Sequence, residues 1–489
     1  MRYAPAGIMK VYFTNLGCKL NQAELERLAR EFHFAGHRVV PRLEEADLHV
    51  VNSCTVTHRA ARDSRKVARR GARRRPGVRT VLTGCYATGS PEEAAALAGV
   101  DLVVPNAEKD RLLDRVHEAF PDARPETSRP RAEGRPDGAG ALDVPFVSLA
   151  FGNTRTLVKV EDGCNVGCAF CIIPHTRGRQ RSRPVPEIVA EVRSMAAAGF
   201  REVVVTGVQI SHYRWQGRGL CDLVETLLAE TGIPRIRLTS IAPWAFDRRL
   251  LDLLREERIC RHVHMSLQSG CDATLERMRR PYRAAAYRAL VDQIRGAVPG
   301  VAVTTDVIVG FPGETAAELA ESLRFVESVG FARTHVFSYS PREGTPAASM
   351  PDPVPPELVK ARTAAMIEAA APGERSFREA HLGRTVQVLW EARKGSAWHG
   401  LTDNYLRVET EAAASAELEN AVTGARIQAL TGDGVRGELA GRSGDVRQGA
   451  PVPSTVDHGV PHRPAESGSP ADRRSGLLPV IAADRSARA

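Results

Sequence analysis

Three cysteines lie within eight positions of one another in VEDGCNVGCAFCIIPHTRGRQRSR, residues 160–183. Cys164, Cys168 and Cys171 form a C-x3-C-x2-C motif, and thiolate is a ligand that both iron–sulfur clusters and zinc favour. A structural zinc site takes four protein ligands, whereas this loop offers three cysteines and, as the obvious candidate for a fourth ligand, His175. Three cysteines suit a four-iron cluster that keeps one iron open for a cofactor or substrate. We favour the cluster, although the spacing alone does not exclude zinc.

Three further cysteines follow apolar, strand-like runs near the N-terminus. The runs VYFTNLGC, HVVNSC and VRTVLTGC end in small polar turns that carry Cys18, Cys54 and Cys85. Strands that alternate with helices indicate a parallel α/β sheet, whose strand C-terminal ends meet at one ligand-binding edge. A single buried cysteine at a strand end is common, but three repetitions favour a shared site. We therefore predict a second iron–sulfur cluster, again with one open iron.

Both cysteine sets resemble those of a known group of enzymes. C-x3-C-x2-C with an aromatic residue, Phe170, before its last cysteine is similar to the motif of radical S-adenosylmethionine (SAM) enzymes. NLGCKLNQAE, VVNSCTVT and TGCYA resemble the N-terminal domain of the methylthiotransferases, a radical-SAM group that inserts methylthio groups. The resemblance covers about residues 10–440 and implies two [4Fe-4S] clusters and SAM. One cluster, on Cys164, Cys168 and Cys171, would bind SAM, and the other, on Cys18, Cys54 and Cys85, would carry the sulfur.

The resemblance also implies a reaction and a substrate. A radical made from SAM would remove hydrogen from an unactivated carbon, which would then receive sulfur methylated by a second SAM. IIPHTRGRQRSRP, TSIAPW and TTDVIVGFPGET look most like the branch that methylthiolates C2 of N6-threonylcarbamoyladenosine at tRNA position 37, next to the anticodon. The alternatives are N6-isopentenyladenosine of tRNA, an aspartate of a ribosomal protein, or, in a different class, a metal-containing RNA-binding protein without catalysis. The expected partners are the tRNA anticodon stem-loop and an electron donor such as flavodoxin or ferredoxin.

The rest of the chain divides into regions that would position these cysteines. We predict an α/β protein with an N-terminal parallel α/β domain, a central radical-SAM partial (β/α)6 barrel and a small C-terminal antiparallel β-barrel that resembles the TRAM domain. The boundaries expected from composition and pattern are 9–120 for the first domain, 121–143 for a flexible linker, 144–375 for the central barrel, 378–441 for the small barrel and 442–489 for a disordered tail.

Polar residues and glycines end the predicted strands of the central barrel, where the chemistry of such barrels gathers. A polar side chain inside an apolar run, such as that of Asp306, needs a partner if it is buried. By the resemblance, the residues expected at the SAM and substrate cavity are Phe170, Gly207, Ser240, Gln268, Asp306 and Tyr339. No catalytic residue is assigned beyond the cluster ligands.

Basic residues are concentrated near the first cysteine set. The chain has a net charge of +9, and ten Lys or Arg residues but one acid, Asp63, lie between Arg59 and Arg79. Such a density favours an anionic partner. The predicted RNA contacts are Arg69, Arg70, Arg73, Arg74, Arg177 and Arg179. Residues 381–440 carry six basic against eight acidic residues, so no generally basic surface is expected there.

The composition bears on location and assembly. No run of about 18 or more uncharged apolar residues is present, and the first residues lack the apolar region of a signal peptide. Nine cysteines in 489 residues are too few for a disulfide scaffold and suit metal binding or catalysis in a reducing compartment. We expect a cytoplasmic protein that does not contact membranes, and a monomer.

Overall fold

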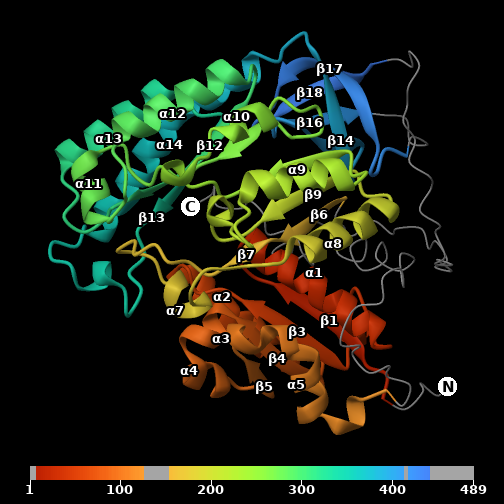
Figure 1. Ribbon diagram of the computed structural model, residues 1–489. Helices are drawn as coiled ribbons and strands as arrows, with labels where there is room; N and C mark the ends of the chain where they lie inside the picture. The colour runs from red at the N-terminus through yellow and green to blue at the C-terminus, as the bar shows by residue number, and fades with distance from the viewer. Residues whose placement is uncertain (1–6, 126–153, 412–416, 441–489) are drawn as a thin grey trace, which may run out of the picture.

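The computed structural model describes residues 7–125, 154–411 and 417–440, which form an N-terminal α/β domain, a central open barrel and a small C-terminal β-barrel (Figure 1). The predicted fold class is confirmed. Most of the predicted linker and the whole predicted tail lie outside the described residues. Within the described residues, no helix is both long and apolar enough to span a membrane.

The N-terminal domain is a five-stranded parallel sheet in the order β2-β1-β3-β4-β5. Its strands are β1 (Lys10–Asn15), β2 (Arg38–Val39), β3 (Leu48–Ser53), β4 (Arg79–Gly84) and β5 (Leu102–Val104). Its helices are α1 (Lys19–Phe34), α2 (His58–Arg74), α3 (Cys85–Gly89), α4 (Pro91–Ala95) and α5 (Leu112–Ala119). Apolar side chains leave the sheet on both faces: Val50 packs with α1 and α5, and Val51 packs with α2 to α4. Burial of both faces explains the continuous apolar runs of these strands.

The central domain has the six parallel strands expected from the sequence, in two hydrogen-bonded sheets, β10-β9-β6 and β11-β12-β13. They are β6 (Arg155–Lys159), β9 (Glu202–Thr206), β10 (Arg235–Leu238), β11 (His262–His264), β12 (Ala302–Val309) and β13 (Arg333–Ser338). A backbone bridge from Ile236 to Ile259 joins the two sheets. The result is one open barrel of six strands in sequence order.

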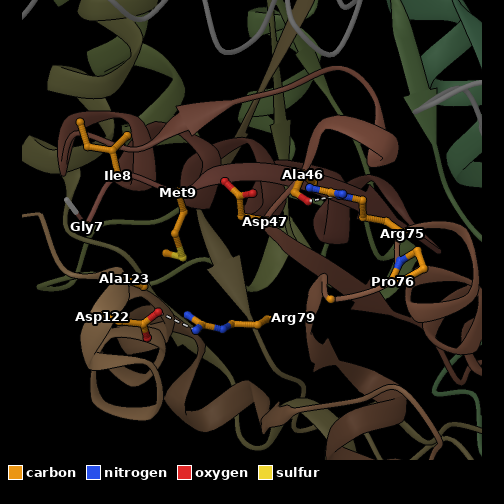
Figure 2. A pocket seen from close by; sticks show the side chains of 11 residues that line it. Gly7, Ile8, Met9, Ala46, Asp47, Arg75, Pro76, Arg79, Asp122 and Ala123 are labelled. Carbon is orange, nitrogen blue, oxygen red and sulfur yellow. Dashed lines mark hydrogen bonds and ion pairs between the residues drawn. The ribbon is translucent and has the colours of Figure 1, made fainter. Parts of the chain in front are cut away.

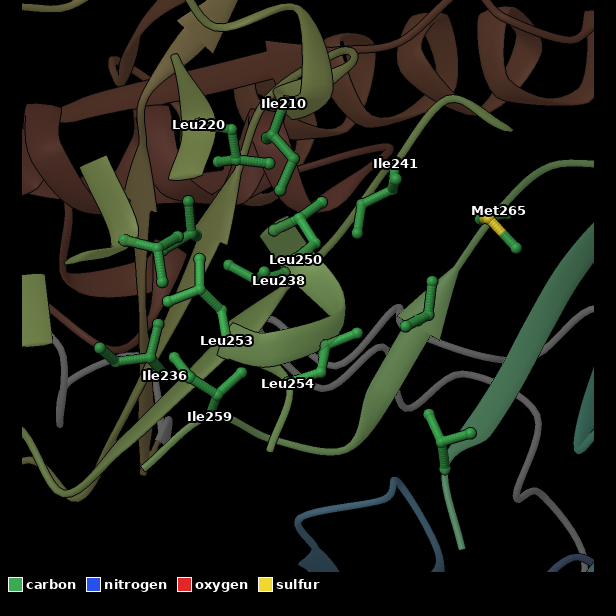
Figure 3. Close-up of a cluster of buried hydrophobic side chains, with 14 of the residues drawn as sticks. Ile210, Leu220, Ile236, Leu238, Ile241, Leu250, Leu253, Leu254, Ile259 and Met265 are labelled. Atoms are coloured by element: carbon green, nitrogen blue, oxygen red, sulfur yellow. The ribbon is translucent and has the colours of Figure 1, made fainter. Parts of the chain in front are cut away.

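Helices cover the outer face of this open barrel. They are α8 (Val185–Ala197), α9 (Leu220–Glu230), α10 (Arg249–Leu253), α11 (Asp272–Arg277), α12 (Ala284–Ala297), α13 (Ala316–Val329) and α14 (Pro356–Glu379). Figure 3 shows side chains of β10 such as Ile236 and Leu238 packed against Leu250 and Leu254 in this core. The other face of β6 and β9 is covered by the first domain, because Ala23 of α1 packs with Leu157 and Val204. Helix α1 therefore belongs to both domains.

The C-terminal domain is a closed barrel in the order β14-β15-β16-β18-β17 around a core that contains Trp390 and Trp398. Its strands are β14 (Thr385–Lys394), β15 (Ala397–Thr402), β16 (Arg407–Glu411), β17 (Val422–Leu430) and β18 (Val435–Leu439). The expectation of a fully antiparallel barrel was wrong at one contact, because β16 and β18 pair in parallel. The parallel pair closes the barrel.

A buried carboxylate, Glu202, joins the central and C-terminal domains. Glu202 forms ion pairs with Arg237 at 2.6 Å and Arg235 at 2.9 Å, and both arginines donate to backbone carbonyls of β15 and the turn after it. Burial acts to raise the pKa of Glu202, but Arg237 and Arg235 lower it to about 2 from its ordinary 4.5. The small barrel is thus held at the N-terminal ends of β9 and β10, away from the predicted site.

We predict that Glu202→Gln destabilises the protein by about 3–5 kcal/mol at pH 7, because it leaves buried guanidinium charges unpaired. A lowered pKa means that the carboxylate stabilises the fold above pH 4.5 and that this contribution is lost as the pH falls toward 2. The difference from the wild type should therefore shrink at pH 4 in urea unfolding followed by tryptophan fluorescence. The control Glu230→Gln, half exposed and paired with Arg193, should cost less than about 1 kcal/mol. An equal loss for Glu202→Gln at both pH values would contradict this account.

Candidate functional site

The first cysteine set lies at one edge of the N-terminal sheet, as the sequence predicts. Cys18 precedes α1, Cys54 follows β3, and Cys85 begins α3 directly after β4. Gly17 has φ +118°, and a Cβ there would lie 2.9 Å from the Cβ of Cys54, so glycine permits the close approach of these two turns. Cys85 lies near enough to Cys18 and Cys54, and Cys18 near enough to Cys54, to act with the larger effect of burial in raising the pKa of Cys18 and of Cys54.

The second cysteine set lies on a loop whose two ends are pinned together. Strands β7 (Glu161–Asp162) and β8 (Arg181–Ser182) pair as a hairpin, and the intervening residues contain the three cysteines and helix α7 (Ile173–Arg177). Cys164 N donates to Gly178 O at 3.0 Å, and Val166 N donates to Cys164 Sγ at 3.4 Å. The loop therefore presents its thiols from a fixed backbone at the C-terminal end of β6.

Helix α7 connects the two cysteine sets. Asn106 of the first domain donates to Thr176 O at 2.8 Å and lies 3.8 Å from Cys85 Sγ. Asn21 accepts from Arg177 Nη2 at 2.5 Å, lies 3.7 Å from Cys18 Sγ and donates to Ser53 O, next to Cys54. The segment just after Cys171 is thus bonded to each cysteine-bearing turn of the other domain.

Arg177 itself is buried, which corrects one prediction. Its side chain is 1% exposed and pairs with Glu24 of α1 at 2.8 Å and with Asp162 at 2.9 Å. We expected Arg177 to contact RNA, but its guanidinium lies between the domains with its donors directed to protein acceptors. An arginine in TRGRQRSR looks like any other in the sequence, and only the packing of α1 reveals its burial. Arg179, in contrast, is exposed, and its RNA contact stays a prediction.

Arg177 belongs to a network of ion pairs. The network consists of the cations Arg177, Lys109, Lys159 and Arg181 and the carboxylates Glu24 and Asp162. Burial acts to raise the pKa of Glu24, but Arg177, Lys109 and Lys159 lower it well below its ordinary value. The three cations that are at most 13% exposed, Arg177, Lys109 and Lys159, exceed the two carboxylates by one charge, and the half-exposed Arg181 adds another. Buried charges need partners. Burial lowers the pKa of Lys109 although Glu24 and Cys85 act to raise it, whereas Glu24 and Cys85 raise the pKa of Arg177 in spite of its burial.

This excess of positive charge fits an anionic group held by Cys18, Cys54 and Cys85, as a thiolate-bound iron–sulfur cluster is. Burial raises the pKa of Cys54 and of Cys171 to about 12, so cluster binding releases their protons. Among the described residues no three His, Cys, Asp or Glu side chains are arranged to hold one metal ion. A four-iron cluster places each thiolate on a different iron, and the two cysteine sets supply the donors that it requires.

A second, partly buried arginine serves the other cysteine set. Arg280 Nη1 lies 3.2 Å from Cys168 Sγ, and its guanidinium stacks over Trp244, with 4.5 Å to the ring centroid. Burial disfavours the charge of Arg280, but Tyr282 and Cys168 raise its pKa above the ordinary value. Arg280 was not among the residues predicted from the sequence. It is the third arginine of LERMRRPY, and no spacing distinguishes it from Arg277 or Arg279.

Several acceptors without partners line the C-terminal ends of the strands. Gly207 faces Glu161: a Cβ at this glycine would lie 2.7 Å from Glu161 Oε2, which accepts from Gln209 N at 2.9 Å. Among the described residues, Glu161 Oε1 and Gln209 Oε1 are buried with no hydrogen-bond partner. Burial raises the pKa of Glu161 to about 8, and an ammonium group, as in SAM, would favour its ionised form. Glu161 and Gln209 were also missed, although VEDGC places a carboxyl three residues before the first cysteine.

The remaining predicted cavity residues lie at the same end of the barrel. Gln268, at φ +67°, ends the pairing of its segment with β12, and its Oε1 is likewise buried without a partner. Asp306 has the partner that burial requires: it accepts from Ser266 at 2.7 Å and from His264 at 3.2 Å. The others are Phe170 and Tyr339, which pack edge-on against Phe311, and Ser240, whose carbonyl accepts from Ile210 N.

A surface pocket lies at the opposite edge of the N-terminal sheet. It is lined by Met9, Asp47 and Arg79, which stand at or just before the N-terminal ends of their strands (Figure 2). Arg79 pairs there with Asp122 at 2.6 Å. Because the cysteines occupy the C-terminal ends of the same strands, this pocket is not part of the candidate site.

Comparison with known families agrees with this geometry. The profile of the Radical SAM superfamily matches residues 158–326, and that of the Uncharacterized protein family UPF0004 matches residues 10–105. The open barrel with its three-cysteine loop defines a radical-SAM enzyme, which uses SAM and a [4Fe-4S] cluster. The first cysteine set lies in the second matched region, outside the radical-SAM match.

Curated relatives extend over most of the chain. "Threonylcarbamoyladenosine tRNA methylthiotransferase MtaB" of Bacillus subtilis is 34% identical, over 81% of this chain and 89% of the relative. The protein of the same name from Aquifex aeolicus is 37% identical, over 82% and 97%. "Ribosomal protein uS12 methylthiotransferase RimO" of Desulforudis audaxviator is 34% identical, over 81% and 88%. The chain belongs to the family of radical-SAM methylthiotransferases.

A solved structure supports the fold. The radical SAM methyltransferase TsrM from Kitasatospora setae, with cobalamin and a [4Fe-4S] cluster bound, has a TM-score of 0.50 at 18% identity. The match covers 70% of this chain and 77% of TsrM. At this identity the likeness concerns architecture alone.

We predict that anaerobic reconstitution yields two four-iron clusters, about eight irons and eight sulfides per chain. Replacing Cys18, Cys54 and Cys85 with Ala should remove about half of both, and so should replacing Cys164, Cys168 and Cys171. The matched control replaces Cys221 and Cys260, which are buried and belong to neither cysteine set, and should keep the full content. Stoichiometric zinc with little iron would favour the metal-containing RNA-binding alternative.

Proposed function

We propose that this protein methylthiolates C2 of N6-threonylcarbamoyladenosine at position 37 of tRNA. The observation that carries the proposal is the bonding of both cysteine sets through α7, since sulfur transfer needs a radical source and a sulfur carrier at one substrate. The substrate branch is supported by the relatives at 34–37% identity whose names specify threonylcarbamoyladenosine. Modification of N6-isopentenyladenosine and of a ribosomal-protein aspartate are the alternatives within the family.

The residues of this chain would prepare the site for its cofactors. When bound, SAM and the two clusters would supply radical formation and the methylated sulfur. Helix α1 packs on β6 and β9 and closes that side of the open barrel. Glu161 and Gln209 offer acceptors beside Gly207 for the SAM ammonium group, and Arg280 lies against Cys168.

The inner face of β13 offers a surface for the substrate base. Ser338 Oγ bonds to Thr363 Oγ1 of α14 and Val336 packs against the core that contains Met366 of α14, so the alternate residues His335 and Phe337 face the other way, opposite Asp306 and Ile308 of β12. Phe337 is 40% exposed, which is unusual for an aromatic side chain inside a barrel. Single-stranded RNA bases stack on such rings, and an adenosine beside the anticodon is accessible in this way.

Helix α2 presents a basic stripe close to the site. Its N-terminal end is anchored to the central domain, because His58 N donates to Ser340 Oγ at 3.0 Å and Arg342 donates to Thr55 O at 2.9 Å. The residues exposed along one side of α2 are Arg62, Lys66, Arg69 and Arg73. None of the four forms an ion pair with another described residue, whereas Arg74 lies 3.7 Å from Glu44 and Arg70 is half-buried. The stripe is suited to RNA phosphates.

The wider setting follows from this function. A tRNA-modifying enzyme works where tRNA is made and used, and we therefore expect the protein in the cytoplasm. The radical-SAM cluster needs one electron at a time, for which flavodoxin or ferredoxin is the expected donor. We expect the enzyme to act as a monomer.

A strain that lacks this protein should lose 2-methylthio-N6-threonylcarbamoyladenosine and accumulate the unmethylthiolated nucleoside. Mass spectrometry of nucleosides from total tRNA measures both. Expression of the wild type, but not of Cys54→Ala, should restore the product. Persistence of this nucleoside with loss of 2-methylthio-N6-isopentenyladenosine would reject the substrate branch, and loss of neither would reject the tRNA function.

We predict that replacing Arg62, Lys66, Arg69 and Arg73 with Gln weakens binding of the anticodon stem-loop and lowers the salt slope of log K by about 3. Each phosphate contact that is lost reduces the number of counterions released on binding, so binding should depend less on the salt concentration. The control replaces four arginines that already pair with carboxylates elsewhere, namely Arg193, Arg255, Arg288 and Arg375. If both variants bind alike, α2 does not contact the RNA.

A further inference from the structure

The buried network around Arg177 has a consequence for the chemistry of the sulfur-carrying cluster. We propose that Arg177 is a positioning residue of the cluster on Cys18, Cys54 and Cys85, and that its charge raises the reduction potential of that cluster selectively. The inference rests on the presence of two clusters and not on the identity of the tRNA substrate.

The geometry ties Arg177 to all three turns of the first cysteine set. Asn21 accepts from Arg177 and donates to Leu16 O at 2.9 Å and to Ser53 O at 3.1 Å, which are the backbones before Cys18 and Cys54. The neighbouring Thr176 accepts from Asn106, the side chain next to Cys85 Sγ. A change at Arg177 therefore alters the support of the first cysteine set.

The charge of Arg177 acts on the same set. A buried positive charge stabilises the more anionic, reduced form of a cluster, and net charge and exposure are among the features that set cluster potentials. Asn21 Oδ1, which accepts from Arg177 Nη2 at 2.5 Å, lies 3.7 Å from Cys18 Sγ. In the second cysteine set the cation beside a thiol is Arg280, whose Nη1 lies 3.2 Å from Cys168 Sγ. Each cysteine set thus has its own neighbouring arginine.

A further cation lies close to the first cysteine set. Asp162 precedes the loop of Cys164 and pairs with Arg177, while Glu24 pairs with Arg177 from α1. Lys109 is buried, pairs with the same Glu24 at 2.7 Å and donates to Asn52, two residues before Cys54. The first cysteine set therefore has a second buried cation beside Arg177.

The test is a redox titration of the reconstituted holoenzyme followed by electron paramagnetic resonance. The cluster whose spectrum changes on addition of SAM is the radical-SAM cluster, so the other signal reports the sulfur-carrying cluster. Arg177→Gln should lower the reduction equilibrium constant of the sulfur-carrying cluster at least tenfold, a shift of about 59 mV for one electron. It should leave the potential of the radical-SAM cluster unchanged. Arg177→Lys keeps the charge and should shift the potential by less than this.

Two further variants complete the design. Arg181→Gln removes a cation that pairs with the same Asp162 but is 50% exposed, and it should shift neither signal. Glu24→Gln removes a carboxylate partner of Arg177 and should raise the reduction potential of the sulfur-carrying cluster. If the iron count shows that Arg177→Gln does not retain the sulfur-carrying cluster, Glu24→Gln provides the test. The absence of an upward shift in Glu24→Gln would then overturn the proposal.

Three results for Arg177→Gln would also overturn it: no shift of either signal, an equal shift of both, or a shift that Arg177→Lys reproduces in full. The last would mean that geometry alone, and not charge, sets the potential. Because no RNA is present in the titration, these outcomes are independent of whether the tRNA substrate is assigned correctly.

Discussion

The architecture depends on the ion pairs that Arg177 forms across the domain boundary. Glu24 belongs to the N-terminal domain and Asp162 to the central one, and a single guanidinium pairs with both. Removing one member of a buried pair leaves an uncompensated charge, which is far costlier than losing an exposed pair. The contact therefore constrains how the two cysteine sets face each other.

Helix α1 makes this arrangement possible because it packs in two directions. Leu25 and Leu28 pack into the N-terminal core, whereas Ala23 meets the inner face of β6 and β9. A helix that contributes to two cores leaves little freedom for one domain to move against the other. The C-terminal barrel is attached through Glu202 at the N-terminal ends of β9 and β10, and its Tyr405 also contacts Lys19 at the start of α1.

Arginine has three distinct uses in this chain. Arg177 is buried and Arg280 is partly buried beside cysteines, Arg237 is buried in an ion pair that holds two domains, and Arg69 and Arg73 are exposed on α2. The first two uses neutralise charge in a region of low dielectric, where a single cation has a large effect. The exposed residues act through number, because solvent screens each of them.

The sequence by itself determined the architecture and the candidate ligands. Cysteine spacing is local, and parallel strands bring their C-terminal ends to one edge, so the six cysteines, the six strands of the barrel and the closed C-terminal barrel could all be predicted. The roles of Arg177, Arg280 and Glu161 could not, because each depends on which neighbours pack around the side chain. Burial and charge pairing between segments more than a hundred residues apart are properties of the tertiary structure, and they decided that Arg177 lies between the two cysteine sets and not on an RNA-binding surface.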